Sequence, residues 1–220
     1  MSHEQALIIG LGQFGTALAR ALTERGVEVL AVDHDKARVQ AIAPHVVEAA
    51  CFDATSEEAL VRAGPQRRDL CVCAIGDDSR ESSIIVTALL RQLGATRVVA
   101  RATDELTERI LSMVGAHEIV HPERDFGERL ATRLRFSGVV DELPLGPDLL
   151  ITELRPPAAM IGRSLAELAL DERFEVQVVA VRHAQEGVNL RPSPTRPLAG
   201  DDILVVVSSP SAVHELCERF

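Results

Sequence analysis

Short apolar runs alternate with helical periodicity through the first two thirds of the chain. Runs of this kind are typical of strands that are buried in a parallel sheet. They occupy residues 6–10, 27–32, 46–50, 70–75, 97–100 and 118–120. Between them, apolar side chains recur at helical spacing, as in Phe14, Ala17, Leu18, Ala21 and Leu22, and in Leu106, Ile110, Met113 and Val114. Because crossovers between parallel strands are almost always right-handed, this alternation predicts an α/β fold with a Rossmann-like doubly wound parallel sheet.

The pattern changes near residue 138. Residues 143–147 carry two prolines and a glycine, which predict an irregular connection. Beyond it, apolar runs at residues 149–154, 176–182 and 203–207 predict strands. A capping box of Ser164 and Glu167 predicts one helix start, and Pro210 predicts another. We therefore expect a Rossmann-like domain over residues 1–138 and a small α+β C-terminal domain over residues 139–220.

Composition and charge exclude several classes of partner. The 220 residues include 23 Lys and Arg against 33 Asp and Glu, a formal net charge of −10, and neither Trp nor Tyr. Nucleic-acid binding favours basic surfaces and stacking aromatic side chains, so no nucleic-acid partner is expected. No apolar run approaches the ~18 residues that a membrane span requires, and the first strand is predicted too early to leave room for a signal peptide. We expect a cytoplasmic protein without direct membrane insertion.

A glycine-rich loop follows the first predicted strand and opens the first predicted helix. Its sequence is Gly10-Leu11-Gly12-Gln13-Phe14-Gly15. In this setting the first glycine permits a tight turn, the second lets the backbone approach a phosphate, and the third lets the helix pack on the sheet. The helix N-terminus adds unpaired N–H groups and the positive end of a dipole, which attract an anion. The alternative is that these glycines only permit close packing.

A carboxylate ends the second predicted strand. Asp33 stands 18 residues after Gly15, where an acid accepts hydrogen bonds from ribose hydroxyls and repels a 2′-phosphate. Two more loops, Asp53-Ala54-Thr55 and Gly76-Asp77-Asp78, are expected beside it, because the carboxyl ends of parallel strands share one edge of the sheet. Ile75, directly before the second loop, is expected to contribute to the same site. The alternative for Asp53 and Thr55 is a helix N-cap. The pattern predicts an adenine-nucleotide site without choosing among NAD, ADP and ATP.

An NAD-dependent oxidoreductase is the alternative function for such a loop. It requires a substrate pocket and a proton donor beside the nicotinamide. The seven histidines are not paired with Lys, Tyr or Ser in a pattern typical of hydride transfer, and no hydrolase or metalloprotease motif is present. We therefore expect no enzyme activity.

Four segments together resemble the RCK (regulator of K⁺ conductance) family. They are residues 7–15, 29–33 and 74–76 and the segment His121-Pro-Glu-Arg-Asp-Phe-Gly127. Along nearly its whole length the chain is similar to the KtrA/TrkA-type cytosolic regulatory subunits of bacterial potassium uptake systems. The resemblance implies a nucleotide-sensing subunit whose homodimers assemble into a ring, an octamer, that docks on an integral-membrane K⁺ channel or transporter at the inner face of the membrane. ATP, ADP or NAD(H) would set the shape of the ring, and that shape would gate ion flow.

The resemblance also assigns roles to single residues. Arg101 matches a basic position near the phosphates. Glu123 matches an acidic position that helps to hold a cation such as Mg²⁺ near the terminal phosphate, although the first turn of a helix also favours an acid. Gln13 stands where ATP-sensing relatives carry Arg, and its neutral amide binds phosphate less strongly, which favours ADP or NAD. The helix over residues 124–136 matches the segment that crosses to the partner subunit. No cyclic di-AMP site is carried over to the C-terminal domain, for which we expect dimerisation.

Overall fold

The computed structural model describes residues 4–76, 79–184 and 187–220. The chain divides into two units, Met1–Arg124 and Asp125–Phe220. The division falls inside helix α6 (Pro122–Arg135), earlier than the boundary expected at residue 138. Residues of α6 from Asp125 to Thr132 line a groove together with Glu142 and Leu150 of the second unit, so this part of the helix is grouped with that unit.

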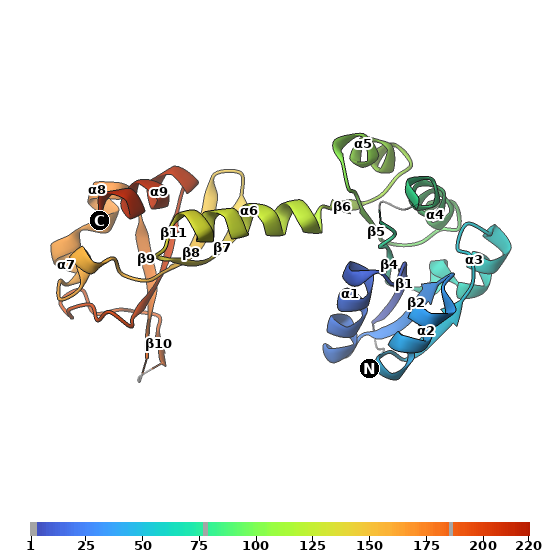
Figure 1. The fold of residues 1–220 in the computed structure, drawn as a ribbon, viewed down its shortest axis with the longest axis horizontal. Helices are drawn as coiled ribbons and strands as arrows, with labels where there is room; N and C mark the ends of the chain where they lie inside the picture. The colour runs from blue at the N-terminus through green and yellow to red at the C-terminus, as the bar shows by residue number, and fades with distance from the viewer. Residues whose placement is uncertain (1–3, 77–78, 185–186) are drawn as a thin grey trace. The chain divides into compact units, whose positions relative to one another are not determined.

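The first unit is built on a parallel β-sheet. Its strands run in the order β3-β2-β1-β4-β5-β6, and every neighbouring pair is parallel. Their bounds are β1 Gln5–Ile9, β2 Glu28–Asp33, β3 Glu48–Cys51, β4 Leu70–Cys73, β5 Val98–Arg101 and β6 Glu118–Val120. Each predicted apolar run coincides with one of these strands to within two residues. The sheet confirms the predicted Rossmann-like doubly wound fold (Figure 1).

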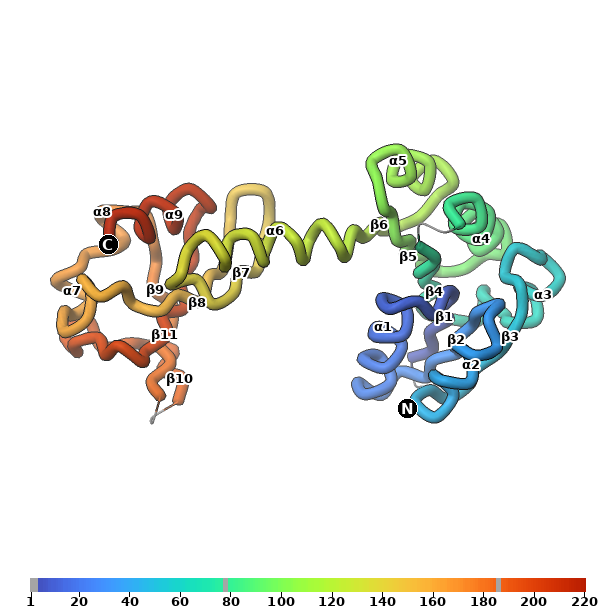
Figure 2. Tube along the Cα trace, viewed as in Figure 1, coloured from blue at the N-terminus to red at the C-terminus, as the bar shows by residue number. Residues whose placement is uncertain are grey.

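Helices cover both faces of this sheet, as the trace in Figure 2 also shows. They are α1 Gln13–Glu24, α2 Lys36–Ile42, α3 Glu57–Ala63, α4 Arg80–Gln92 and α5 Glu105–Met113, with short 3-10 turns at Ala43–His45 and Pro65–Arg67. Successive strand residues point to opposite faces. Ile8 therefore joins a core with α1 and α2, whereas Leu7 and Ile9 join a core with α3, α4 and α5. Burial on both faces explains why the strands read as continuous apolar runs.

Helix α5 buries a different face from the one that its periodicity indicates. The helix is present, but Leu106 and Met113 of the expected stripe are exposed, Met113 to 79%. Thr107 and Leu111 are buried instead. Because α5 carries apolar side chains on more than one face, spacing alone could not identify the face that packs on the sheet.

The second unit is built on an antiparallel sheet in the order β10-β9-β11-β8-β7. Its strands are β7 Val139–Gly146, β8 Leu149–Leu154, β9 Gln177–His183, β10 Gly187–Asn189 and β11 Ile203–Ser208. The irregular connection predicted at residues 143–147 is wrong, because most of it belongs to β7. β7 is an edge strand, where Pro144 requires no N–H partner, and its register shifts between Pro144 and Gly146.

Short helices complete the second unit. They are a 3-10 turn at Ala158–Met160, α7 Leu165–Leu168, α8 Leu170–Phe174 and α9 Pro210–Arg219. The predicted capping box is confirmed, since the Ser164 hydroxyl accepts from the Glu167 N–H and the Glu167 carboxylate accepts from the Ser164 N–H at 2.8 Å. Met160, Leu204 and Leu216 are fully buried in the core. Helix α6 has no buried residue. Among the described residues, no helix has the length and apolar character that a membrane span requires.

Candidate functional site

A cleft of about 610 Å³ opens at the carboxyl edge of the parallel sheet. It lies where the chain order switches between β1 and β4, the usual position of a ligand in doubly wound sheets. Loops that follow β1, β2, β3 and β4 line it together with the end of β5. Among the predicted site residues, the cleft brings together Gly10, Gly12, Asp33, Asp53, Ala54, Thr55, Ile75, Gly76 and Arg101. Asp77 and Asp78 of the expected loop lie outside the described residues.

Three further predicted residues lie outside the cleft lining for different reasons. Phe14 packs against the core beneath α1. Gly15 is buried where α1 meets the end of β1. Glu123 contacts Arg101 at the start of α6 but does not line the cleft. Phe14 and Gly15 lie in the first turn of α1, and a contact of their N–H groups with a ligand stays a prediction.

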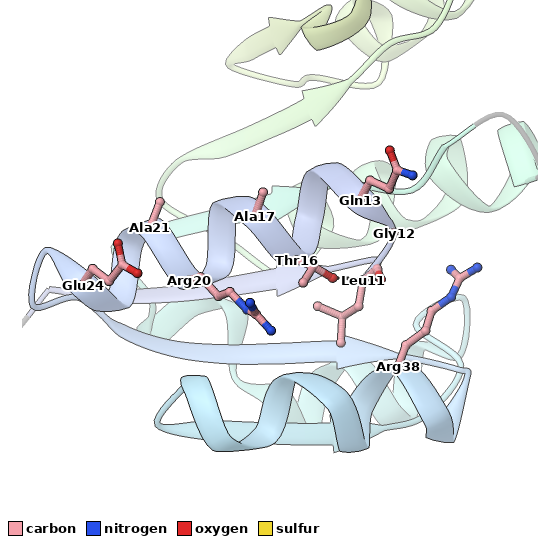
Figure 3. Close-up of a pocket in the computed structure, with 9 residues that line it drawn as sticks. All are labelled: Leu11, Gly12, Gln13, Thr16, Ala17, Arg20, Ala21, Glu24 and Arg38. Atoms are coloured by element: carbon pink, nitrogen blue, oxygen red, sulfur yellow. Dashed lines mark hydrogen bonds between the residues drawn. The ribbon is translucent and has the colours of Figure 1, made fainter.

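Gln13 lines a neighbouring groove instead of the cleft. This groove, of about 710 Å³, runs along α1 and shares Gly12 and Arg38 with the cleft (Figure 3). The Gln13 amide projects from the first turn of α1, and the Arg38 side chain extends from α2 toward the glycine loop (Figure 3). Both side chains therefore lie near the N-terminus of α1, which is the position expected for a phosphate.

The three glycines of the loop have different structural roles. Gly10 has a φ of +96°, and a Cβ there would lie 2.9 Å from the Ile75 nitrogen. A Cβ on Gly15 would lie 1.8 Å from the Gly10 carbonyl oxygen. Close packing thus requires glycine at both positions, as the packing alternative supposed. A Cβ on Gly12 would have no atom within 4 Å, so Gly12 faces open space at the mouth of the cleft.

Asp33 anchors the glycine loop to the end of β2. Its carboxylate is 4% exposed and accepts hydrogen bonds from the Leu11 N–H at 2.6 Å and the Asp35 N–H at 2.8 Å. His34 Nδ1 also lies 3.3 Å from this carboxylate. A carboxylate has about four acceptor positions, so these partners do not use its full accepting capacity. Asp33 therefore holds the glycine loop in shape, and its contact with a ribose stays a prediction.

Arg38 is a cleft residue that the sequence reasoning missed. Its Nη1 lies 3.7 Å from the Asp33 carboxylate, and its Nε lies 3.8 Å from the carboxylate of Asp35. Asp35 caps α2 by accepting from the Ala37 N–H. A signal was present, because a cation three residues after a helix-capping acid lies beside it on the first turn.

Asp53 and Thr55 form a local turn at the cleft. The Thr55 N–H and hydroxyl donate to the Asp53 carboxylate at 2.9 and 2.7 Å. These two bonds hold the pKa of Asp53 below its ordinary value, so the carboxylate is charged at neutral pH. The alternative that these residues cap a helix is wrong, since Ser56 caps α3 by accepting from the Ala59 N–H.

Arg101 and Glu123 form an ion pair beside the cleft. Arg101 Nη2 lies 2.7 Å from Glu123 Oε1, and Arg101 Nε lies 3.3 Å from Oε2. The Arg101 side chain is 14% exposed, whereas that of Glu123 is 63% exposed. Within the described ranges, no group of three or more His, Cys, Asp or Glu is placed to hold a metal ion. The cation role of Glu123 therefore stays a prediction.

The cleft combines open space with backbone N–H donors at its mouth. Gly12 is the N-cap of α1 and supplies no side-chain acceptor, so the first N–H groups of the helix are not capped by it. Open space lies beside Gly12, and the Asp33 carboxylate ends β2 at the same cleft, an arrangement that is typical of nucleotide-binding sheets. Fold and cleft together define the class of Rossmann-type nucleotide-binding domains.

Comparison with known proteins identifies the family within this class. Residues 6–122 match the TrkA-N domain, and residues 149–220 match the TrkA-C domain. Ktr system potassium uptake protein C of Bacillus subtilis is 32% identical over 212 residues, which are 96% of this chain and 95% of that protein. Ktr system potassium uptake protein A of Vibrio alginolyticus is 34% identical over 203 residues, 92% of each chain. The chain belongs to the family of TrkA-N and TrkA-C domain proteins, which confirms the resemblance.

Solved structures show the same fold. The GsuK channel bound to NAD matches 98% of this chain with a TM-score of 0.67 at 16% sequence identity. The GsuK RCK domain also matches 98% of it, with a TM-score of 0.55 at 25% identity. This chain spans 40% and 46% of those two chains, so it corresponds to one part of them.

Proposed function

We propose that this chain is the nucleotide-sensing regulatory subunit of a potassium uptake system. The observation that carries the proposal is the cleft, where Gly12 leaves open space at an uncapped helix N-terminus and Asp33 stands beside it. Ktr system potassium uptake proteins that are 32% and 34% identical over nearly the whole chain support the physiological context. The names of these relatives describe transport, not catalysis, which agrees with the expectation that the chain is not an enzyme.

The ligand in this proposal is an adenine nucleotide. Its ribose hydroxyls donate to Asp33, and its phosphates lie at the N-terminus of α1. A neutral Gln13 near that terminus favours ADP or NAD over ATP, because the third phosphate of ATP gains no charge-assisted bond from it. A cation such as Mg²⁺, held by Glu123 near the phosphates, is part of the same proposal.

Regulation requires that the nucleotide bind one conformation better than another. A ligand with equal affinity for both conformations would shift neither population. We propose that homodimers assemble into a ring, an octamer, on the cytoplasmic side of a membrane K⁺ channel or transporter. The nucleotide would set the shape of the ring and so gate ion flow.

Helix α6 supports the dimer in this proposal. Phe126 and Leu134 are 56% and 77% exposed, and they lie with Leu130 at four-residue spacing on one side of the helix. We propose that a second copy of the chain covers this side. A charge placed there, as in Leu134→Glu, is expected to break the ring and to lower the mass measured by light scattering, and an unchanged mass would contradict the interface.

The functional test is K⁺ flux in vesicles that contain a Ktr-type membrane subunit. Flux is expected to depend on this chain and to change when ADP, ATP or NAD is added to nucleotide-stripped protein. The Gly15→Ala variant should not respond to nucleotide, because its loop is displaced. K⁺ flux that changes neither when this chain is added nor when nucleotide is added would contradict the proposal. Steady NAD-dependent turnover of small alcohols or hydroxy acids would favour the oxidoreductase alternative.

A further inference from the structure

The guanidinium of Arg101 faces two different surroundings. On one side it packs over Gly76, where a Cβ would lie 2.7 Å from Nη1, and both residues line the cleft. On the other side its Nε and Nη2 bond both carboxylate oxygens of Glu123. Arg101 is therefore a nearly buried cation that is shared between the ligand cleft and a residue outside its lining.

Neighbouring loops connect this cation to the phosphate position. The tight approach of Gly10 to Ile75 joins the glycine loop to the loop after β4. Gly76, the next residue of that loop, is the one that contacts Arg101. Because β1, β4 and β5 are adjacent in the sheet, their carboxyl ends place the glycine loop, Gly76 and Arg101 in one row.

Glu123 lies at the start of the helix that leads into the second unit. It is the second residue of α6, and the division between the units falls after Arg124. Its carboxylate is largely solvent-exposed even though it is paired with Arg101. Only the Glu123 side of the pair is exposed, so water can replace Arg101 there, whereas the nearly buried Arg101 requires another anion when Glu123 leaves.

We propose that Arg101 is exchanged between Glu123 and the phosphates of the bound nucleotide. This inference rests on the proposed function and names the regulatory contact of the same site. In the empty cleft Arg101 holds Glu123, and in the occupied cleft it turns its donors to a phosphate and releases the first turn of α6. When no divalent cation is present, Glu123 acts as a competitor for Arg101 and therefore lowers the affinity for phosphorylated ligands.

The donor geometry of arginine is the reason for exchange. A guanidinium binds carboxylate or phosphate best through an edge that presents two parallel N–H groups. Glu123 takes the edge formed by Nε and Nη2, which leaves Nη1 and the second N–H of Nη2 toward the cleft. A phosphate gains the donors of the Nε edge when Glu123 leaves. The phosphate would lie in the more enclosed cleft, where the attraction between charges is stronger than at the exposed Glu123. By linkage, the release of Glu123 and the binding of phosphate favour each other.

The test compares three variants of the full chain, stripped of nucleotide and titrated in EDTA. Glu123→Gln removes the competing charge, and Arg101→Met removes the shared cation. Glu118→Gln is the matched control, because Glu118 pairs with Arg97 at 2.6 Å at the opposite end of the β5–β6 pair. The probes are ADP and adenosine, which differ only in the phosphates. EDTA removes divalent cations, so the loss of Glu123 as a metal ligand cannot change the ADP affinity that is measured for Glu123→Gln.

Exchange predicts a gain of affinity in one variant and a loss in another. Glu123→Gln is expected to bind ADP about three-fold more tightly, which is within the range of an exposed ion pair. Arg101→Met is expected to bind ADP about ten-fold more weakly, as for a lost charge-assisted bond. Adenosine affinity should be the same in all variants, and Glu118→Gln should match wild type. A destabilised fold could not produce the gain.

The double variant separates exchange from simple charge repulsion. If Glu123 acts through Arg101, then Glu123→Gln has no effect on ADP binding in the Arg101→Met background. A persistent gain there would overturn the proposal, as would unchanged or weaker ADP binding in Glu123→Gln alone. Wild-type protein that binds neither ADP nor any other adenine nucleotide would instead contradict the proposed function.

A fluorescence readout follows the release of α6. The chain contains no Trp, so Phe126→Trp on α6 gives indole emission without background from other residues. ADP is expected to shift this emission in the otherwise wild-type chain. The double variant Phe126→Trp, Glu123→Gln should show the shifted emission without ligand, and ADP should change it little. If ADP shifts the emission equally in the single and the double variant, the link between the cleft and α6 is overturned.

Discussion

The sheet of the first unit is covered by helices on both faces, whereas the sheet of the second unit carries exposed apolar side chains on its edge strands. The edge strands β3 of the first unit and β10 of the second both bury none of their residues, but β3 has no exposed large apolar side chain. Leu143 and Leu145 of β7 and Val188 of β10 are each more than half exposed. The parallel sheet gathers its loops at one edge and forms a cleft there, while the antiparallel sheet offers apolar edges. The difference indicates ligand binding in the first unit and, as we propose, contact with other chains in the second.

The largest expected effect is that of Gly15→Ala in the first unit. The new Cβ would lie 1.8 Å from the Gly10 carbonyl oxygen, so the loop or α1 must move. We expect a loss of more than about 3 kcal/mol in the free energy of unfolding, and no saturable ADP binding by calorimetry. The matched control is Gly12→Ala, which meets no atom within 4 Å and should leave stability unchanged.

The same control sharpens the assignment of the phosphate position. The methyl group of Gly12→Ala would occupy the open space at the mouth of the cleft. We expect ADP to bind about ten-fold more weakly, a change of ~1.4 kcal/mol, in a protein of normal stability. Wild-type ADP affinity in this variant would place the phosphates elsewhere.

Core truncations test whether the units act separately. Leu204→Ala in the second core and Leu7→Ala in the first both empty fully buried positions, and each should cost about 3 kcal/mol of stability. Only Leu7→Ala is expected to weaken ADP binding, because Leu7 lies on the strand that carries the glycine loop. Thermal unfolding measures the stability of each variant, and titration calorimetry measures its ADP affinity. An equal loss of ADP affinity in both variants would show that the two units do not act separately.

A smaller effect is expected from Asp33→Asn. In Asp33 both carboxylate oxygens accept hydrogen bonds, one from the Leu11 N–H and one from the Asp35 N–H. The amide of asparagine keeps one acceptor oxygen and has no negative charge. We expect stability to fall by about 1–2 kcal/mol and the affinity for both ADP and adenosine to fall, because the ribose is common to both ligands. Asp35→Asn is the control, since Asn caps a helix as well as Asp does. Loss of the fold in Asp33→Asn would assign the acid a purely structural role.

The smallest effect is expected from Ser164→Ala in the second unit. It removes the capping box of α7 and should lower stability by about 1 kcal/mol without changing ADP affinity. The backbone N–H of Ser164 and, second to it, the Ser164 hydroxyl hold the pKa of Glu167 below its ordinary value of 4.5, and the substitution removes only the contribution of the hydroxyl. That contribution is present above pH 4.5 and is lost as the pH falls through the lowered pKa. Denaturant titrations across this range should show less acid destabilisation in the variant than in wild type.

The strands of the first unit could be predicted from sequence because burial on both faces leaves an unbroken apolar signal. The edge strand β7 could not, since Pro144 and Gly146 are breakers in a central strand but are tolerated where no partner is required. For α5, Met113 was expected in the core and is exposed, because contact with the sheet decides which apolar face is buried.

Within the site, the glycine loop and Asp33 were predictable because their spacing is tied to one backbone geometry. The pairing of Arg101 with Glu123 was not, because it joins residues that are 22 positions apart through the packing of β5 beside β6. For Arg38 the spacing from Asp35 was a signal for the ion pair on α2, but its position at the cleft also depends on how α2 lies beside the glycine loop.

The most direct test of the central claim is the melting temperature of nucleotide-stripped protein with ADP, ATP, NAD and NADH, with and without Mg²⁺. A ligand present at 100 times its dissociation constant adds ~2.7 kcal/mol, or about 5–10 °C for a chain of this length. We expect a shift of that size with ADP or NAD, and none in Gly15→Ala. The absence of a shift with every adenine nucleotide in the wild-type protein would contradict the assignment of the cleft.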